Sequence, residues 1–360
     1  MQEVNIKVIS RCRPLNLREI QNGSQSILDC NKNLAQVSVK LPARKEQTSE
    51  GQIEGEQART FQFDMVYGED ATNQELFTES FRPVVHAFVE GQNGCIFAYG
   101  QTGAGKTFTM SGNGTQPGCM PSSFNYIFEY ISQQPSTVSI SVRASCIEIY
   151  NERITDLISQ QTDLRIRQKP EQAIYIENLS EHSCGTKEDL QKILEKGYRN
   201  QCIEATKMGQ CSSRSHTMFI IKLEKTEVVN GEKVCKLSTL KMIDLAGSER
   251  PEISRFKESM MINKSLASLY VVVSKLASQA PHIPYRDSQL TRLMQDALDG
   301  NSKTMLVALI SPASQNYEET LSTLRFADQV KKIPNQQINK PQIKQESNQL
   351  AINQEYLEQK

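Results

Sequence analysis

One eight-residue segment constrains this chain more than any other part of its sequence. Residues 100–107 read Gly-Gln-Thr-Gly-Ala-Gly-Lys-Thr and fit the phosphate-binding pattern G-x-x-x-x-G-K-[ST] at every fixed position. In such a loop, glycines allow successive backbone N–H groups to point at phosphate oxygens. The lysine reaches the β- and γ-phosphates, and the threonine hydroxyl binds Mg²⁺. The segment predicts a nucleoside triphosphate site, with a ligand-free glycine-rich turn as the alternative. Its residues are Gly100, Gln101, Thr102, Gly103, Ala104, Gly105, Lys106 and Thr107.

Two segments farther along the chain add groups that such a site needs. The first is Ser212-Ser213-Arg214-Ser215-His216, and the second is an apolar strand that ends in Asp244-Leu245-Ala246-Gly247. An acid at the end of a strand beside the phosphate loop holds Mg²⁺ through water, and the following glycine can donate its N–H to the γ-phosphate. Alone, the first segment fits an exposed polar turn equally well, and the second is a weak pattern. Together, and in this order, they indicate a site that senses the γ-phosphate.

Apolar patterns predict one large α/β domain. Residues 95–99 form a short apolar run, which is typical of a buried strand leading into the loop. Apolar residues alternate with others from Val138 to Cys146, which predicts a strand with one buried face. Residues at helical spacing flank the loop on both sides: Phe77, Phe81, Val84, Val85, Phe88, Phe124, Ile127, Phe128 and Ile131. No Pro/Gly/Ser-rich linker divides the chain, and residues 43–58 are expected to form a polar surface loop.

Composition excludes several other classes of protein. No apolar run approaches the length of a membrane-spanning helix, and the first residues lack the pattern of a signal peptide, so we expect no membrane insertion. The nine cysteines include no C-x-x-C pair, which argues against a metal finger or a disulfide framework and indicates a reducing, cytosolic compartment. The four histidines share no ligand spacing, so Mg²⁺ is the one metal expected. The net charge is zero, and no nucleic-acid partner is predicted.

With these motifs in place, the chain resembles a kinesin motor domain from about residue 4 to about residue 333. The resemblance rests on the three segments above and on five more in the family's order: Arg11-Cys12-Arg13-Pro14, Glu148-Ile149-Tyr150-Asn151-Glu152, Ile262-Asn263-Lys264-Ser265-Leu266, Pro284-Tyr285-Arg286-Asp287-Ser288 and Thr320-Leu321-Ser322-Thr323-Leu324-Arg325-Phe326-Ala327. It implies a P-loop NTPase fold, α/β, with a central, mostly parallel or mixed sheet and helices on both faces.

The resemblance also implies a role for each site residue. ATP is the expected substrate, with Arg11, Arg13, Pro14 and Phe108 around the adenine; an exposed edge-strand pair is the alternative for the two arginines. The sequence has no guanine-reading Asn-Lys-x-Asp motif. Its one Asn-Lys-Ser segment, residues 263–265, is followed by Leu266 and not by aspartate. Ser213 would join Thr107 on Mg²⁺, with Asp244 holding the metal through water. Ser212 would place the attacking water, and Gly247 would contact the γ-phosphate. Arg214 would pair with Glu249 to close the site; two unrelated surface charges are the alternative.

The resemblance implies that the partner is the microtubule. It also implies that the protein is located in the cytoplasm, on the cytoskeleton. Between residues 250 and 340, twelve basic side chains stand against eight acidic ones, which is a modest bias toward an acidic track. The candidate contacts are Lys264, Lys275, Arg286 and Arg292. The loop over residues 277–281 has no lysine run, so we expect no long-lived electrostatic tether.

The resemblance divides the chain into a motor domain over residues 1–330, a neck linker over 331–342 and the start of a helical segment over 343–360. A motor that precedes its linker is the plus-end-directed arrangement. Ile343, Leu350 and Leu357 recur every seven residues, at most the edge of a coiled coil, so a homodimer would form through sequence beyond the motor.

Several positions depart from the family pattern. Gly209 stands where the family usually has asparagine, and only twelve residues separate Glu249 from Ile262. Tyr270, Gln289 and Ser122 replace a usual glycine, lysine and arginine. The expected function is an ATP-hydrolysing, plus-end-directed microtubule motor. The alternatives are a microtubule-binding protein with impaired ATPase and no motility, and an unrelated P-loop phosphotransferase, which would need an acceptor site that the sequence does not supply.

Overall fold

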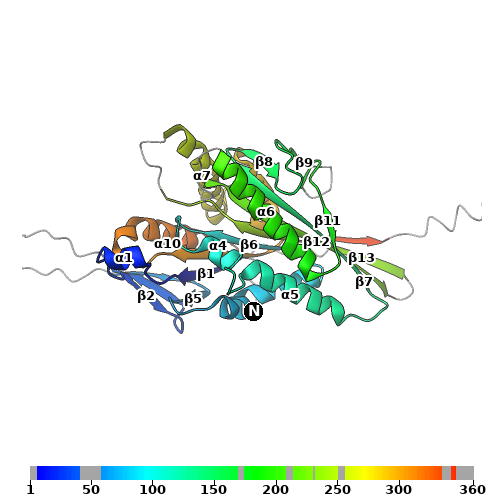
Figure 1. Cartoon of the computed structure of the whole chain (residues 1–360), viewed down its shortest axis with the longest axis horizontal. Coiled ribbons are helices and arrows are strands. Elements are labelled where there is room, and N and C mark those ends of the chain that lie inside the picture. Colours follow the sequence, from blue (N-terminus) through cyan, green and yellow to red (C-terminus); the bar gives the residue numbers. More distant parts are fainter. Residues whose placement is uncertain are drawn as a thin grey trace, which may run out of the picture.

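A ten-stranded mixed sheet runs through the molecule, with helices packed on both of its faces (Figure 1). The structure is a computed structural model and describes residues 6–40, 58–168, 174–207, 214–229, 232–249, 256–334 and 342–345. Side chains of residues 203–207, 256–263 and 342–345 and of positions 229 and 232 are outside this description. The predicted surface loop therefore lies outside the described residues, apart from its last position.

The large sheet has the strand order β11-β7-β12-β13-β6-β14-β1-β5, with β8 paired to β7 and β15 to β13. From β13 to β5 the neighbouring strands are parallel, whereas β11, β7, β12 and β13 are antiparallel. The strands are β1 (Ile6–Cys12), β5 (Met65–Tyr67), β6 (Gly94–Tyr99), β7 (Ser139–Tyr150), β8 (Arg153–Asp156), β11 (His182–Cys184), β12 (His216–Val229), β13 (Glu232–Asp244), β14 (Lys303–Ile310) and β15 (Gln342–Gln345). This mixed sheet confirms the predicted fold class.

Two small sheets lie beside the large one. The first joins β2 (Leu28–Asn31), β3 (Gln36–Val39) and β4 (Arg59–Gln62), and the second pairs β9 (Ile166–Gln168) with β10 (Ile174–Ile176).

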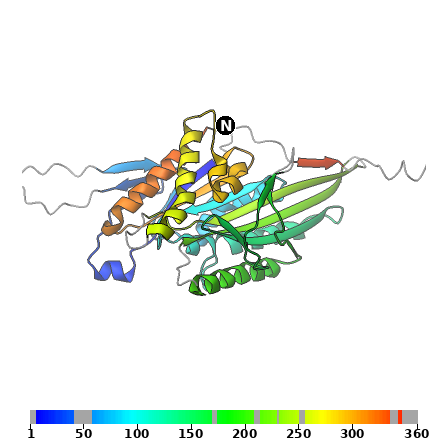
Figure 2. The ribbon, with the colours of Figure 1, turned by 90° about the horizontal axis from the view of Figure 1, so that it is seen from above.

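Helices form two layers, and Figure 2 shows α7 and α10 side by side on one face of the sheet, with α6 on the other. The first layer contains α7 (Phe256–Ala277), α8 (Gln289–Leu293), α9 (Gln295–Leu298) and α10 (Tyr317–Lys331). The second contains α3 (Arg82–Val89), α5 (Cys119–Ser132) and α6 (Lys187–Lys207). Shorter helices connect these elements: α1 (Leu17–Gln21), α2 (Asn73–Leu76), η1 (Phe77–Phe81), α4 (Lys106–Met110), η4 (Tyr285–Asp287) and η5 (Ser314–Asn316). Among the described helices, none is long and apolar enough to cross a membrane.

Each layer of helices closes one hydrophobic core. Along β6, Cys95, Phe97 and Tyr99 face the core under α7 and α10, whereas Ile96 and Ala98 face the core under α3 and α5. Because side chains alternate across a strand, a central strand covered on both faces is apolar throughout. The short apolar run before the phosphate loop is therefore the buried strand that the sequence predicts.

The single buried face predicted over residues 138–146 is confirmed except at Ser145, which is buried on the other face of β7. Even-numbered residues such as Val142 and Cys146 face one core, but Ile147 and Ile149 face the other, and Ser145 is also buried. The pattern over 138–146 is dominated by the outer part of the strand. The inner part has both faces buried, because Ile147 and Ile149 enter the core under α7 and α10 whereas Ala144 and Cys146 enter the core under α3 and α5.

The end of the chain differs from its prediction as well. Residues 342–345 form β15, which pairs antiparallel with β13 so that Val234 lies opposite Gln345 and Leu237 opposite Gln342. The helical segment predicted from residue 343 is wrong for its first three residues. Residues 335–341 and 346–360 lie outside the described chain, so the rest of that segment stays a prediction.

Asp299, at the end of α9, gives the fold a pH dependence that can be measured. Burial, and then the nearby Asp296 carboxylate, raise the pKa of Asp299 to about 6. A carboxyl whose pKa is raised by folding stabilises the fold when protonated, and this contribution is lost as the pH rises through about 6. We expect Asp299→Asn to raise the free energy of unfolding at pH 7.5 by about 1–2 kcal/mol.

The gain from Asp299→Asn should shrink between pH 6 and 4, where the wild-type carboxyl takes up its proton. Urea denaturation at a series of pH values measures it, with the exposed Asp287→Asn as the matched control. A gain that does not change with pH would contradict this account.

Candidate nucleotide-binding site

The predicted phosphate loop connects the carboxyl end of β6 to the start of α4. Gly103 and Gly105 have φ angles of +78° and +97°, a region that favours glycine. A side chain at Gly100 has no room, because a Cβ there would lie 2.1 Å from the Leu309 carbonyl oxygen on β14. The glycines of the motif therefore meet two separate demands, namely the left-handed turns of the loop and its close approach to the neighbouring strand.

Lys106 is held on the inner side of this loop. Its ammonium group donates to the carbonyl oxygens of Gly100 at 2.8 Å and Gln101 at 2.9 Å, and the residue is 8% exposed. Burial lowers the pKa of Lys106, while the carboxylates of Asp244 and Glu249 oppose that shift. The loop thus keeps a positive charge within reach of phosphate groups that it would enclose.

Thr107 and Asp244 meet where the sequence predicts a magnesium site. The Thr107 hydroxyl donates to one carboxylate oxygen of Asp244 at 2.6 Å. The other oxygen, Oδ1, is buried and has no hydrogen-bond partner among the described residues. Burial raises the pKa of Asp244, against the opposing effects of Thr107 and Lys106. A hydroxyl beside a carboxylate with one unpartnered oxygen suits Mg²⁺, which prefers oxygen ligands.

Gly247 and Glu249 lie directly against the phosphate loop. The Glu249 carboxylate accepts from the Thr102 backbone N–H at 2.8 Å and from the Thr102 hydroxyl at 2.5 Å. A Cβ at Gly247 would lie 2.3 Å from both the Thr102 hydroxyl and Glu249 Oε2. The Ser248 N–H donates to the Gly100 carbonyl at 3.1 Å. The segment after β13 and the phosphate loop therefore form one continuous site.

The segment Ser212-Ser213-Arg214-Ser215-His216, which we call the first switch segment, is described only in part. Ser212 and Ser213 lie outside the described residues, as does Gly209, so their predicted roles stay predictions. Arg214 is described, but the ion pairs among the described residues do not include one between Arg214 and Glu249. The pair between these residues was expected to close the site, and it also stays a prediction.

At the other end of the loop, Arg11 is buried instead of lying on a sheet edge, because β1 runs between β14 and β5. Its guanidinium donates to the Asn73 side chain at 2.6 Å, the Thr109 hydroxyl at 2.8 Å and the Ala71 carbonyl at 2.9 Å. It also lies 5.2 Å from the centre of the Phe108 ring. The exposed edge-strand interpretation is therefore wrong for Arg11.

Arg13 and Pro14 lie beside the phosphate loop as well. Arg13 Nε donates to the Gly103 carbonyl at 2.7 Å, and its other nitrogens bind the buried Glu19 carboxylate at 2.6 and 2.7 Å. Pro14 is exposed. The structure therefore brings Arg13 to the loop and Arg11 to Phe108, while contact with an adenine stays a prediction.

The bonds of Arg11 predict a stability effect that is independent of any nucleotide. Arg11→Leu should lower the free energy of unfolding by about 2–4 kcal/mol, because three acceptors lose their donor inside the protein. Urea denaturation without nucleotide measures this loss. The matched control is Arg82→Leu, since Arg82 is exposed and its described contact is with the Tyr126 ring. Equal stabilities of the two variants would argue against an architectural role for Arg11.

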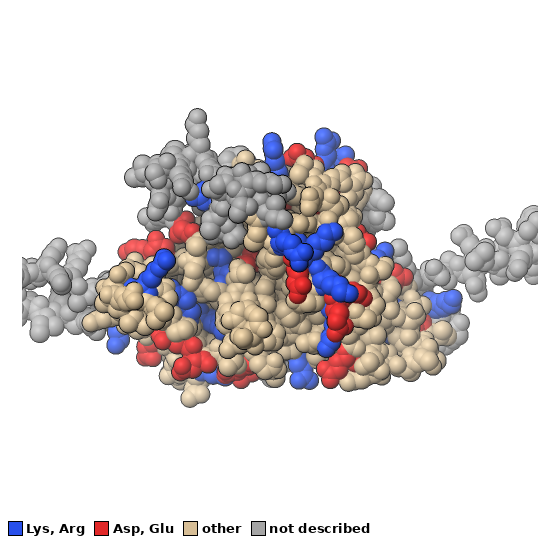
Figure 3. All heavy atoms as spheres, in the orientation of Figure 1, with Lys and Arg blue, Asp and Glu red and all other residues tan. Residues whose placement is uncertain are grey.

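The four predicted microtubule contacts lie on neighbouring elements. Lys264 and Lys275 are on α7, Arg286 is on η4 and Arg292 is on α8, and α7 packs against both η4 and α8. Lys264 and Arg286 are exposed, whereas the other two are half-buried. Figure 3 shows basic and acidic side chains intermixed over α6, in keeping with a net charge of zero.

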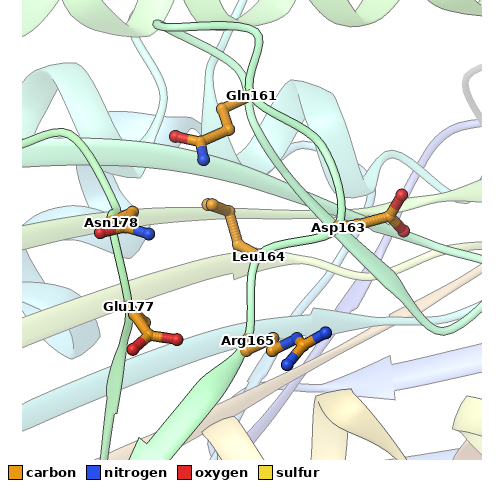
Figure 4. A pocket seen from close by; sticks show the side chains of 6 residues that line it. All are labelled: Gln161, Asp163, Leu164, Arg165, Glu177 and Asn178. Atoms are coloured by element: carbon orange, nitrogen blue, oxygen red, sulfur yellow. The ribbon is translucent and has the colours of Figure 1, made fainter.

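A small pocket of about 150 Å³ lies away from these residues (Figure 4). It lies between the segment that precedes β9 and the residues that follow β10, and its lining is mostly polar: Gln161, Asp163, Leu164, Arg165, Glu177 and Asn178. It contains none of the predicted site residues.

Sequence reasoning missed several residues that hold the site together. His216 binds the backbone of Ala246 and the Ser265 hydroxyl, and Gln201 on α6 donates to Ser215 and Thr217. His216 and Ser265 stand inside motifs that the sequence does display, so their place in those motifs was an available signal. Asn73 and Gln201 carry no such signal, because both stand outside the sequence motifs.

Comparison with known proteins agrees with this geometry. The family model of the kinesin motor domain matches residues 11–333. Kinesin-like protein KIF3C of Pongo abelii is 37% identical over 377 residues, which cover 95% of this chain and 46% of that protein. KIF3C of Bos taurus is also 37% identical, over 375 residues and with the same coverage. The chain thus spans about half the length of these relatives.

A solved structure gives the same answer in three dimensions. It is described as the structure of a fast kinesin, with implications for ATPase mechanism and interactions with microtubules. The two structures superpose with a TM-score of 0.84 at 34% identity, and the match covers 96% of each chain. With the family model matched over most of its length, this chain belongs to the kinesin motor domain family.

Proposed function

We propose that this chain is a microtubule motor that hydrolyses ATP and moves toward the plus end. The observation that carries the proposal is the continuous contact between the phosphate loop and the segment after β13, through Thr107 with Asp244 and Thr102 with Glu249. A loop that binds phosphates and a segment that contacts it can respond together to the γ-phosphate. Family membership excludes an unrelated P-loop phosphotransferase.

In this proposal the loop N–H groups and Lys106 bind the β- and γ-phosphates. Thr107, Ser213 and Asp244 would hold Mg²⁺, which neutralises phosphate charge when bound. The Gly247 N–H would contact the γ-phosphate, and Ser212 would orient the attacking water. Positioning and charge stabilisation supply most of the rate of phosphoryl transfer, so these residues act mainly through their geometry.

Closure of the site would bring Glu249 to Arg214. Since Glu249 accepts two hydrogen bonds from Thr102, this pairing would exchange contacts with the phosphate loop for a contact with the first switch segment. An ion pair that forms only in the closed state favours the transition state over the ground state. The pair would therefore act on turnover more than on ATP binding.

The proposed output is docking of the neck linker, residues 331–342. The linker begins at the end of α10, which lies on the same face of the sheet as α7. It ends at the start of β15, which pairs with β13. Strand pairing of the kind that β15 makes with β13 would let the linker dock by main-chain hydrogen bonds. We also propose that the chain works on cytoplasmic microtubules and dimerises through sequence beyond the motor domain.

A microtubule-binding protein with impaired ATPase is the second candidate. It is favoured by Gly209 and by the short segment between Glu249 and Ile262, both of which depart from the family pattern. Glycine in place of asparagine increases the backbone freedom of the chain just before the first switch segment. That segment would therefore close over the nucleotide site less often.

Gliding of polarity-marked microtubules over surface-anchored protein tests the proposal against this alternative. Plus-end-directed movement requires the microtubules to glide with their minus ends leading. Binding without gliding at saturating ATP would favour the second candidate. Gliding with plus ends leading would overturn the proposed direction.

A further inference from the structure

His216 lies at a junction of three elements of the site. It is the first residue of β12 and the last residue of the motif Ser212-Ser213-Arg214-Ser215-His216, and it is 2% exposed. Its Nδ1 accepts a hydrogen bond from the Ala246 backbone N–H at 2.9 Å, in the segment after β13. Its Nε2 lies 2.7 Å from the hydroxyl of Ser265 on α7, which is 3% exposed. One buried ring therefore joins the phosphate-sensing segment to the helix of the predicted microtubule contacts.

The hydrogen bonds fix the protonation state of this ring. A backbone N–H can only donate, so Nδ1 must be the unprotonated nitrogen. Nε2 then carries the hydrogen and donates it to the Ser265 hydroxyl. Burial, and then the nearby Lys106 ammonium, lower the pKa of His216 to about 3. The ring thus stays neutral at physiological pH and keeps one orientation.

Both partners of His216 are adjacent to residues with predicted roles. Ala246 directly precedes Gly247, whose N–H would contact the γ-phosphate. Ser265 directly follows Lys264, a predicted microtubule contact. The backbone that carries the ring is fixed as well. In β12, His216 pairs with Ile149 of β7, and the next residue, Thr217, pairs with Asp244 of β13. A displacement of α7 would therefore pull on the backbone of residues 246–247 through a short and rigid side chain.

We infer that His216 is a positioning residue that couples the orientation of the Ala246–Gly247 peptide to the position of α7. The inference rests on the proposed function, since it names the contact through which a microtubule bound at α7 would influence ATP turnover. His216 touches neither phosphate nor water in this account. It acts through the backbone of Gly247 on one side and through Ser265 on the other.

Variants can remove separately the two hydrogen bonds of His216, which we call the His216 bridge: one to the Ala246 N–H and one to the Ser265 hydroxyl. Ser265→Ala removes only the bond to α7. His216→Asn keeps an acceptor close to the position of Nδ1 and loses the donor toward Ser265, whereas His216→Gln keeps a donor close to Nε2 and loses the acceptor. The control is Ser274→Ala, because Ser274 is a half-buried serine on the same helix.

In steady-state ATPase assays, Ser265→Ala should keep basal turnover and the KM for ATP within about twofold of wild type and lower the microtubule-stimulated kcat by about tenfold, a typical strength of coupling between sites. His216→Asn should lower stimulation to the same extent, and adding Ser265→Ala to it should change nothing further, because both remove the same bond. Full stimulation in Ser265→Ala, or independent losses in the double variant, would overturn the inference.

A second measurement decides the matter without any ATPase activity. Amide hydrogen exchange across residues 245–248 should be about tenfold faster in Ser265→Ala than in wild type or Ser274→Ala, since the Ala246 N–H depends on a ring that Ser265 holds. Wild-type protein without microtubule stimulation would refute the proposed function, and faster exchange in Ser265→Ala would still support the bridge. Unchanged exchange would overturn the inference whatever the ATPase result.

Discussion

Replacing Lys106 with alanine is expected to reduce ATP turnover by at least about 100- to 1,000-fold, the cost of removing one group that stabilises transition-state charge. Its ammonium group lies inside the phosphate loop, where burial strengthens its attraction for an anion. Among the described residues, it is the lysine that donates to the carbonyls of the loop itself. Steady-state ATPase assays at saturating ATP, with and without microtubules, measure the loss.

A matched control separates loss of the site from loss of a buried lysine. Lys225 on β12 is 6% exposed, against 8% for Lys106, and it donates to the Tyr130 hydroxyl outside the site. Lys225→Ala should therefore keep turnover within about threefold of wild type while losing a comparable buried contact. Normal turnover in Lys106→Ala would mean that the phosphate loop is not the active site.

Glu249→Ala is expected to lower microtubule-stimulated hydrolysis by about 100-fold while leaving ATP affinity within a few-fold of wild type, because the proposed ion pair forms only as the site closes. Arg214→Ala should have the same effect. A double-mutant cycle on stimulated turnover measures their interaction, which should be about 0.5–3 kcal/mol for contacting partners. Coupling near zero would refute the pair.

Glu249 also binds Thr102, and this second contact needs its own control. Thr102→Val removes the hydroxyl that donates to Glu249 and keeps the backbone N–H that donates at 2.8 Å. It should change stimulated turnover by less than about fivefold, since the closed state exchanges this contact for the one with Arg214. If Thr102→Val lowers stimulated turnover as much as Glu249→Ala does, Glu249 acts through its contact with the phosphate loop and not through Arg214.

The parts of the site that the sequence predicts are those written in contiguous residues. Residues 100–107 specify the loop and its glycines, and the apolar run before them specifies a strand that must be covered on both faces. The acid at the end of β13 is found in the same way. Each depends on local backbone geometry, which short patterns record well.

The parts that the sequence does not predict depend on the order of strands in the sheet. Arg11 is buried because β1 lies between β14 and β5, and its partners Asn73 and Thr109 come from elements far apart along the chain. The inner half of β7 is buried on both faces because its side chains enter both hydrophobic cores. Periodicity reports the faces of one element and does not report what packs against them.

The His216 bridge shows a third limit of sequence patterns. Its motif marks the residue as part of a switch, yet nothing in the motif names Ser265 as its partner. That contact exists because β12 begins under α7, at the level where β13 ends. A motif can therefore indicate a site while the long-range contacts that make the site responsive remain hidden.

Steady-state ATP hydrolysis, titrated with microtubules, tests the central claim of this account most directly. A nucleotide site continuous with the segment that leads to α7 predicts low basal turnover that rises by at least about tenfold and saturates as microtubules are added, which is the size expected for coupling between two sites. The stimulated rate should also be lost in Lys106→Ala. Turnover that is indifferent to microtubules, in protein that still binds ATP, would contradict the assignment of this chain as a motor.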